Sequence, residues 1–201
     1  MKRAFQMDFL RAHGLRPGDH LLDIGCGSLR GGAALIDYLD PCCYTGVDVR
    51  EQVLIEARRE QASEKLTYKK PNIVLASDGL DALHFGRHFD VVWAFSVLFH
   101  LSDEILETCF TLASRHLDPD RGVFYANVIL GNGPPGQWQG FPVLPRSMQH
   151  YRALAQRHGL RTEDLGLLSE LGHRSGDSSQ DSQTMLAFRV DATTRAGVSG
   201  N

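Results

Sequence analysis

Two acidic residues and a glycine turn carry the clearest chemical signal in this sequence. Asp23 stands near the end of an apolar run, and Gly25 and Gly27 follow it at alternate positions. Because glycine lacks a Cβ atom, a ligand can lie close to the backbone of such a turn. A second apolar run, 44–48, ends in Asp48, where doubly wound folds place the carboxylate that binds ribose hydroxyls. Together these segments predict a site for a nucleoside-containing cofactor.

The spacing after Gly25 differs from that of the NAD-binding folds. Their fingerprint is Gly-x-Gly-x-x-Gly, whose third glycine packs the following helix against the strand. Arg30 stands at that position here, and an acid such as Asp23 before the turn is foreign to the fingerprint. An NAD-linked oxidoreductase is therefore disfavoured, and reduction of NAD on mixing with candidate substrates would revive it.

The motif Asp23-x-Gly25-x-Gly27 resembles instead the first motif of class I S-adenosylmethionine-dependent methyltransferases. The family often has a third glycine where this chain has Leu29, although two glycines follow closely. The resemblance implies that Asp23 lies near the amino group of the methionine moiety, which rests against the glycine turn. It implies S-adenosyl-L-methionine as cofactor and ten residues at its site: Asp23, Gly25, Cys26, Gly27, Asp48, Val49, Asp78, Gly79, Phe95 and Ser96.

Later segments continue the resemblance in order, over roughly 21–190. The Asp78-Gly79 pair ends a third strand, where the family commonly places an acid that hydrogen-bonds the adenine amino group. The segments 89–101 and 115–122 resemble the family's fourth strand and the turn into its fifth. An Asp-Gly pair is also a common turn, so Asp78 keeps a purely structural interpretation as well.

The ends of the fourth and fifth strands exclude two subclasses. Methyltransferases that act on amino groups of DNA bases resemble one another in an Asp/Asn-Pro-Pro-aromatic box, where this chain has 94–97, Ala-Phe-Ser-Val. Metal-dependent catechol-type enzymes supply carboxylates at these two ends, where this chain offers Ser96 and Asn127. A hard cation therefore lacks the oxygen ligands it prefers, and we expect no metal.

The candidate general base is His100, which follows the fourth strand at the edge where open parallel sheets bind ligands. A neutral imidazole there could accept a hydroxyl proton, although the side chain could equally pack against or cap the next helix. His150 and His173 could also enter the pocket, but each is expected at the surface or at a helix end. Trp138 and Phe141 suit a lid over an apolar substrate, or a small core beneath a long loop.

Strand-like and helix-like segments alternate along the chain, which predicts a three-layer α/β fold. The resemblance implies a mostly parallel sheet of seven strands in a Rossmann-like methyltransferase arrangement, with an antiparallel last strand. Expected helices span 3–13, 32–39, 51–63, 103–117 and 147–158. Expected strands span 21–24, 44–48, 72–76, 89–95, 123–130, 161–168 and 183–190.

Bulk properties agree with a single globular domain. The 201 residues predict one domain over 1–190, with a helical cap (1–19), a lid loop (131–146) and a flexible tail (191–201). The net charge of −3 gives no reason to expect a nucleic-acid partner. The four cysteines form no Cys-x-x-Cys pair, and no long apolar run suggests a membrane span or a secretion signal. A reduced, cytoplasmic location is expected.

The expected activity is metal-independent transfer of a methyl group from S-adenosylmethionine to an oxygen or nitrogen atom of a small molecule. Two alternatives stay open: a non-catalytic protein that binds S-adenosylmethionine or acts as a scaffold, and a protein-directed methyltransferase. The sequence identifies neither the acceptor nor the oligomeric state.

Overall fold

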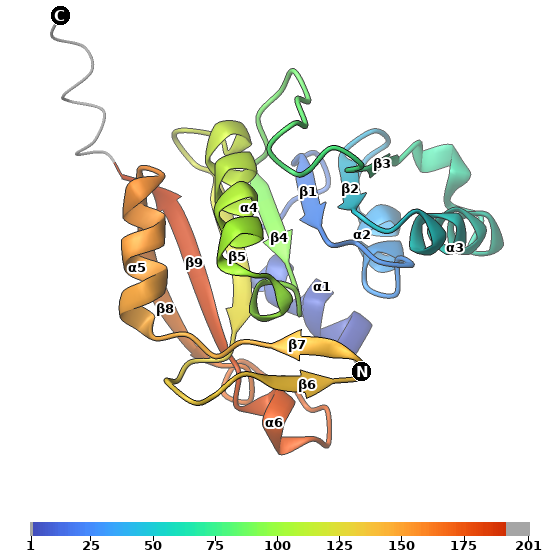
Figure 1. Ribbon diagram of the computed structural model, residues 1–201. Coiled ribbons are helices and arrows are strands. Elements are labelled where there is room, and N and C mark those ends of the chain that lie inside the picture. Colours follow the sequence, from blue (N-terminus) through green and yellow to red (C-terminus); the bar gives the residue numbers. More distant parts are fainter. Residues whose placement is uncertain (1, 192–201) are drawn as a thin grey trace, which may run out of the picture.

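Seven strands form one sheet in the computed structural model, which describes residues 2–191 (Figure 1). Their order is β3-β2-β1-β4-β5-β9-β8. The strands are β1 (Leu21–Ile24), β2 (Tyr44–Asp48), β3 (Asn72–Leu75), β4 (Val91–Ala94), β5 (Val123–Val128), β8 (Leu160–Leu167) and β9 (Thr184–Val190). This is the predicted three-layer, Rossmann-like architecture.

The first five strands are parallel, so their carboxyl ends meet along one edge of the sheet. The register pairs Ile24 of β1 with Val47 of β2, and Asp48 with Leu75 of β3. Strands β1, β2, β4 and β5 are buried along their whole length, as expected of parallel strands covered on both faces. The loops that follow β1, β2 and β4 therefore come together at the carboxyl edge.

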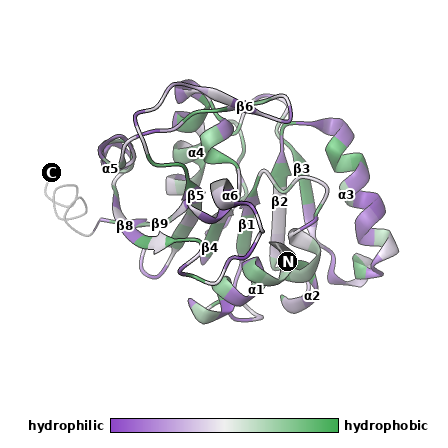
Figure 2. Ribbon diagram, turned by 90° about the horizontal axis from the view of Figure 1, so that it is seen from below, coloured by the Kyte–Doolittle hydropathy of each residue, from purple (hydrophilic) through white to green (hydrophobic). Residues whose placement is uncertain are grey.

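Strand β9 runs antiparallel to both of its neighbours, β5 and β8. The predicted reversal of the last strand is thus confirmed. Because β9 starts at the carboxyl edge, the 168–183 segment that leads into it lies there as well, together with the short helix α6 (Ser178–Asp181). Figure 2 shows α6 in front of the sheet when the molecule is viewed from that edge.

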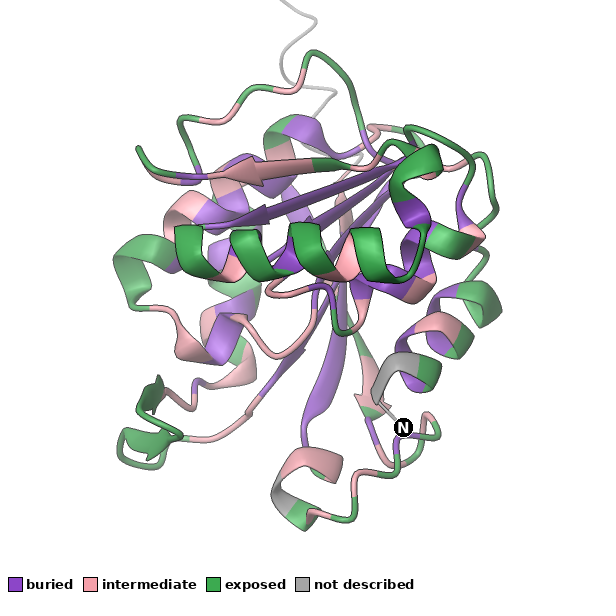
Figure 3. Ribbon diagram, turned by 90° about the vertical axis from the view of Figure 1, so that its right-hand side faces the viewer, coloured by how far each residue is buried: buried purple, intermediate pink, exposed green. Residues whose placement is uncertain are grey.

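Helices cover both faces of the sheet, and each face has its own apolar core (Figure 3). One core lies under α4 (Asp103–His116) and α5 (Met148–Arg157). The other lies under α1 (Lys2–Ala12), α2 (Gly32–Tyr38) and α3 (Glu51–Ser63). Two short 3₁₀ helices, η1 (Leu66–Lys69) and η2 (Leu98–His100), complete the connections. Ser102 caps α4 as its sequence suggests, accepting a hydrogen bond from the Ile105 amide.

The structure differs from the sequence-based expectations chiefly in the 131–146 loop. A small hairpin forms there from β6 (Gly136–Trp138) and β7 (Phe141–Val143). Its two-residue turn has positive φ at both Gln139 (50°) and Gly140 (83°), as tight hairpins of the primed type require. Strand β4 is shorter than predicted because Phe89 makes only an isolated bridge. The predicted flexible tail lies, from residue 192 on, outside the described residues.

Within residues 2–191, no helix is both long and apolar enough to cross a bilayer. All four cysteines are free thiols, and Cys42 is the exposed one.

Candidate functional site at the carboxyl edge

The glycine turn after β1 is tied to β2 by its own backbone. The amides of Gly25 and Cys26 both donate to the carbonyl oxygen of Val47, at 2.8 and 3.0 Å. Gly25 has φ of 73°, and a Cβ atom there would lie 2.7 Å from the Val97 side chain beyond β4. The turn therefore needs glycine at this position both for its backbone conformation and for the close approach of Val97.

The residues after the turn explain how the chain manages without a glycine at position 29. Leu29 has φ of 63°, a left-handed conformation that a leucine adopts only at some cost. Its side chain is completely buried, so apolar packing offsets that strain. Gly32 is the residue that needs to lack a side chain, because a Cβ atom there would clash with the Tyr44 hydroxyl.

Asp48 is the most highly connected side chain of the predicted site. Its buried carboxylate accepts a hydrogen bond from the Gly27 amide at 3.1 Å. The Arg50 amide donates to the same carboxylate, and the Arg50 guanidinium forms a two-pronged ion pair with it at 3.0 and 3.1 Å. Beside it, the Val49 side chain is 56% exposed. Arg50 was not predicted, although a basic residue two positions after a strand-end acid is a recognisable signal.

Asp23 lies below the turn, inside the protein. It accepts a hydrogen bond of 2.6 Å from the Tyr44 hydroxyl. Burial raises the pKa of Asp23 to about 7, Asp48 adds to the rise, and the Tyr44 hydrogen bond opposes it. The same burial raises the pKa of the Cys26 thiol, so Cys26 is a neutral side chain at the turn.

The other predicted cofactor residues follow β3 and β4. The Ala76 amide donates to the Asp48 carbonyl oxygen at 3.0 Å, which sets the Asp78-Gly79 turn beside β2 with Asp78 exposed. Phe95 stacks on Trp93 with ring centroids 5.5 Å apart. Ser96 is left-handed (φ 59°). Its amide donates to the buried side chain of Asn127, 2.7 Å away on β5. Asp23 and Asp48 thus lie near the carboxyl ends of β1 and β2, and the other eight predicted positions lie in the connections that follow β1, β2, β3 and β4.

His100 lies beneath the β6–β7 hairpin. Because a carbonyl oxygen only accepts, the His100 Nδ1 donates to the Pro142 carbonyl at 2.6 Å. The ring centroids of Phe141 and Trp138 lie 5.8 and 6.3 Å from the imidazole. The Arg50 guanidinium lies over the Phe141 ring, with its carbon 5.5 Å from the ring centroid. The hairpin therefore contacts both η2 and the Asp48–Arg50 ion pair.

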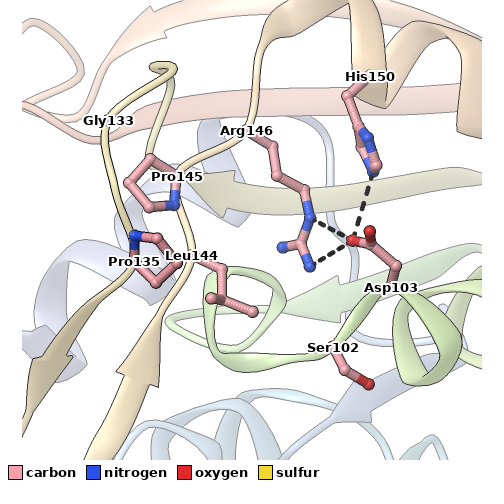
Figure 4. A pocket seen from close by; sticks show the side chains of 8 residues that line it. All are labelled: Ser102, Asp103, Gly133, Pro135, Leu144, Pro145, Arg146 and His150. Atoms are coloured by element: carbon pink, nitrogen blue, oxygen red, sulfur yellow. Dashed lines mark hydrogen bonds and ion pairs between the residues drawn. The ribbon is translucent and has the colours of Figure 1, made fainter.

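The base of the hairpin is fixed by a buried arginine. Arg146 forms an ion pair with Asp103 at 2.8 Å and donates to the carbonyl oxygens of Leu98 and Leu101. These contacts border a pocket of about 350 Å³, drawn in Figure 4, which also includes His150. The predicted lid loop is therefore clamped at its base, while Trp138 and Phe141 near its tip stay 43% and 41% exposed.

His173 corrects the sequence-based expectation of a surface or helix-end residue. Its side chain is 2% exposed, and its Nδ1 lies 2.9 Å from the Asp181 carboxylate. The ring lies 4.9 Å from that of Phe5 on α1 and 6.0 Å from that of Phe95. The sequence signal that could have found it is an acid eight positions later in a polar loop that leads back to the sheet.

Within residues 2–191, no three His, Cys, Asp or Glu side chains lie together so that they could hold a metal ion. The carboxyl edge thus combines a glycine turn, the strand-end carboxylate of Asp48 and the aromatic rings of Phe5 and Phe95.

Residues 22–124 match the family model described as a methyltransferase domain, which covers just over half of the chain. Comparison with curated proteins finds no match. The fold resembles a solved S-adenosylmethionine-dependent methyltransferase from Clostridium acetobutylicum, with 13% identity, a TM-score of 0.69 and coverage of 94% of this chain and 91% of that one.

Two further solved structures are similar to this one. Magnesium protoporphyrin IX methyltransferase from Synechocystis, with bound S-adenosylmethionine, shares 16% identity at a TM-score of 0.69, over 94% of this chain and 79% of that one. The CcbJ methyltransferase from Streptomyces caelestis shares 18% identity at a TM-score of 0.67, over 95% and 89%.

The chain belongs to the methyltransferase-domain family. Its fold is that of the S-adenosylmethionine-dependent methyltransferases, as the glycine turn predicts.

Proposed function

We propose that this methyltransferase transfers a methyl group from S-adenosylmethionine to an oxygen or nitrogen atom of a small-molecule acceptor, without a metal. The observation that carries the proposal is the Asp48 carboxylate, held by the Gly27 amide beside a turn that a Cβ atom at Gly25 would block. When bound, the cofactor supplies a methyl carbon activated by the adjacent sulfonium. The protein has to bind it, align it and exclude water.

The cofactor contacts follow from the chemistry of each side chain. Asp48 would accept hydrogen bonds from the two ribose hydroxyls, which requires Arg50 to turn away. The exposed Val49 side chain offers apolar surface to the adenine, and the exposed Asp78 carboxylate would accept from its amino group. Asp23 with the turn 25–27 would lie on the methionine side, and Phe95 and Ser96 would border the methyl group.

Several features support a small, metal-independent acceptor reaction. Helix α1, the β6–β7 hairpin and the 168–183 segment crowd the carboxyl edge, which favours a small acceptor over a folded protein surface (Figures 1 and 2). The Asn127 amide is already used by Ser96 and Gln183 and is poorly placed to bind a cation. The net charge of −3 is unfavourable for a nucleic-acid backbone, and the free thiols fit a cytoplasmic location. His100 remains a candidate base at the hairpin side.

Calorimetric titration with S-adenosylhomocysteine tests the cofactor site. We expect micromolar binding of S-adenosylhomocysteine, no binding of NAD, and a loss of about tenfold or more in affinity for Asp48→Asn, because the amide is a weaker acceptor for two hydroxyls. Asp37→Asn, an exposed carboxylate on α2, is the matched control and should bind normally. Absence of binding to the wild-type protein would refute the proposal. Tight binding without transfer to any acceptor would favour the non-catalytic alternative.

A further inference from the structure

A buried histidine, His173, is paired with a partly exposed aspartate, Asp181, in the segment between β8 and β9. His173 Nδ1 and the Asp181 carboxylate are 2.9 Å apart. Because a carboxylate only accepts hydrogen bonds, Nδ1 carries the hydrogen in this contact. The neutral imidazole then presents a lone pair at Nε2, which is the form of histidine that accepts a proton.

The local structure holds this pair in place. Asp181 also accepts hydrogen bonds from the amide and the hydroxyl of Ser175, both at 2.9 Å. The Ser175 amide is the main reason that the pKa of Asp181 is lowered, so the carboxylate stays charged beside the imidazole. The His173 amide in turn donates to the Leu168 carbonyl oxygen at 2.8 Å. The ring orientation is therefore fixed from both sides.

The other ring nitrogen has no protein partner. Within the described part of the chain, His173 Nε2 is buried and makes no hydrogen bond. Leaving a buried acceptor unpaired is unfavourable, so a donor from a ligand would be stabilised here. The neighbouring rings are those of Phe5 and Phe95, which form a triangle with the imidazole whose sides are 4.9, 5.8 and 6.0 Å. The imidazole ring thus packs against Phe5 of α1 and against Phe95, which follows β4.

We propose that His173 is the general base for a flat aromatic acceptor that carries a hydroxyl group, and that Asp181 positions it. The inference rests on the proposed methyl transfer and deepens it. A phenol gains most from such a base, whereas a neutral amine attacks with its own lone pair and loses its proton afterwards. The aromatic triangle favours a ring-shaped acceptor, which can stack or meet the phenylalanines edge to face.

The step balances in atoms and charge. The phenol proton moves to Nε2 while the phenol oxygen bonds to the methyl carbon. The carbon–sulfur bond breaks, and its electron pair stays on sulfur, which gives S-adenosylhomocysteine and a methyl ether. The positive charge of the sulfonium is replaced by that of the imidazolium, which Asp181 stabilises. The proton then passes to solvent.

This assignment gives the two histidines separate tasks. His100 contacts the hairpin through Pro142, whereas His173 contacts Phe5 of α1. His100 would then act through the position of the hairpin. Substitution of each residue by asparagine distinguishes the two, since the asparagine amide at position 173 can still donate to Asp181 but offers no acceptor in place of Nε2.

The experiment uses S-adenosylhomocysteine, p-cresol and 4-nitrophenol as probes. We expect wild type, His173→Asn and the exposed-histidine control His88→Asn to bind S-adenosylhomocysteine equally. In the ¹⁵N-histidine NMR spectrum of the loaded wild-type protein, p-cresol should shift the Nε2 signal that is absent from His173→Asn. With S-adenosylmethionine, His173→Asn should lose about 10²–10⁴-fold in kcat on p-cresol. It should lose little on 4-nitrophenol, which is already ionised at an assay pH of 8.5.

Each other result overturns the inference. Equal losses on both phenols would show a structural role, and a loss of S-adenosylhomocysteine affinity would make His173 a cofactor contact. A selective loss in His100→Asn instead would assign the base to His100. If the wild-type protein binds S-adenosylhomocysteine but neither methylates p-cresol nor shifts its Nε2 signal, the phenol acceptor is wrong while the cofactor proposal stands. If it does not bind S-adenosylhomocysteine, the proposed function itself fails.

Discussion

The two strand-end acids of this site are both buried, yet their surroundings differ in kind. Asp48 accepts hydrogen bonds from the Gly27 and Arg50 amides and from the Arg50 guanidinium. Asp23 accepts a hydrogen bond from the Tyr44 hydroxyl. Burial raises the pKa of Asp23 by more than this hydrogen bond lowers it. In the sequence, both acids stand at or near the end of an apolar run. Their chemistry is set by neighbours that come from elsewhere in the chain.

Arg50 is expected to compete with the cofactor for Asp48. Its guanidinium occupies both carboxylate oxygens and has to leave before ribose hydroxyls can bind. Since the arginine side chain is 46% exposed, the pair contributes only about 0.2–1 kcal/mol. Arg50→Ala should therefore tighten S-adenosylhomocysteine binding by up to about fivefold, measured by calorimetry. Weaker binding would instead make Arg50 a cofactor ligand; Arg58→Ala, on the solvent side of α3, is the control.

Asp23 should make stability depend on pH in a defined window. Its pKa is 3.8 ordinarily and about 7 in the folded protein, so the folded state binds the proton more tightly. Stability from this group is therefore full below about pH 4 and is lost as the pH rises to about 7. Relative to wild type, Asp23→Asn should gain about 2–4 kcal/mol in unfolding free energy between pH 4 and pH 8. Urea denaturation at both values measures it, and a pH-independent difference would contradict it.

At the scale of elements, the carboxyl edge is covered by α1 and by the β6–β7 hairpin, which differ in how extensively they are packed against the rest of the domain. Helix α1 is fixed through buried Phe5, Phe9 and Leu10, and by the Trp93 indole, which donates to Gln6 at 3.1 Å. The base of the β6–β7 hairpin is held by Arg146, and the hairpin contacts His100 through ring contacts and a hydrogen bond to Pro142. The hairpin is accordingly the element that can open with the least loss of contact.

Removal of the hairpin's aromatic contacts should affect the ligand more than the fold. We expect the double substitution Trp138→Ala, Phe141→Ala to raise the dissociation rate of S-adenosylhomocysteine about tenfold, since both rings lie over the edge of the site. The melting temperature should change little because both side chains are more than two-fifths exposed. Stopped-flow measurement tests this, with the exposed aromatic Tyr68→Ala as control. An unchanged dissociation rate would show that the hairpin does not retain the ligand.

The sequence predicts most elements because apolar periodicity and caps are local signals. The helix 51–63 has the predicted bounds, and the antiparallel last strand is where the family resemblance implies. The hairpin is missed because its strands have three residues each and its turn, Gln139-Gly140, lacks the usual Asn or Asp. Ile105 has helical spacing to the buried residues of α4, yet it is 46% exposed because it lies in the first turn of the helix.

The site is predicted less completely than the fold, because many of its residues are far apart in the sequence. The glycine turn and Asp48 lie in one βαβ unit, so their spacing is visible in the sequence. The partners that set their chemistry are far apart in the chain: Phe5, Phe95 and His173 meet only after β9 has been inserted between β5 and β8. No local pattern shows that a polar loop, 168–183, returns to bury a histidine at this edge.

At the scale of the whole molecule, insertion of β9 is secured by an aromatic cluster away from the site. Phe124 and Phe188 are paired across β5 and β9, and Phe110 of α4 packs edge-on against both at 5.4 and 4.9 Å. All three side chains are completely buried. The cluster connects the parallel strands to the β8–β9 pair. Its loss should therefore lower the stability of the entire domain.

Phe110→Ala should therefore lower the unfolding free energy by about 3–5 kcal/mol, through lost burial and a residual cavity. Ile105→Ala on the same helix should cost less than about 1 kcal/mol, because that side chain is half exposed. Urea denaturation compares the two variants. At temperatures where both are folded, their affinities for S-adenosylhomocysteine should equal that of wild type. A small effect of Phe110→Ala would mean that the inserted strand is held elsewhere.

The antiparallel direction of β9 also determines where a reporter group can be attached without blocking the site. Because β9 runs from the crowded edge back to the opposite one, Asp191 pairs its amide with the Gly159 carbonyl oxygen on the far side of the sheet from the glycine turn (Figure 1). A fluorescent reporter attached directly after Asp191 would therefore start from the edge that lies opposite the glycine turn. One attached at the start of α1 would lie near the carboxyl edge, where the cofactor is proposed to bind. Attachment after Asp191 is therefore preferable for ligand screening.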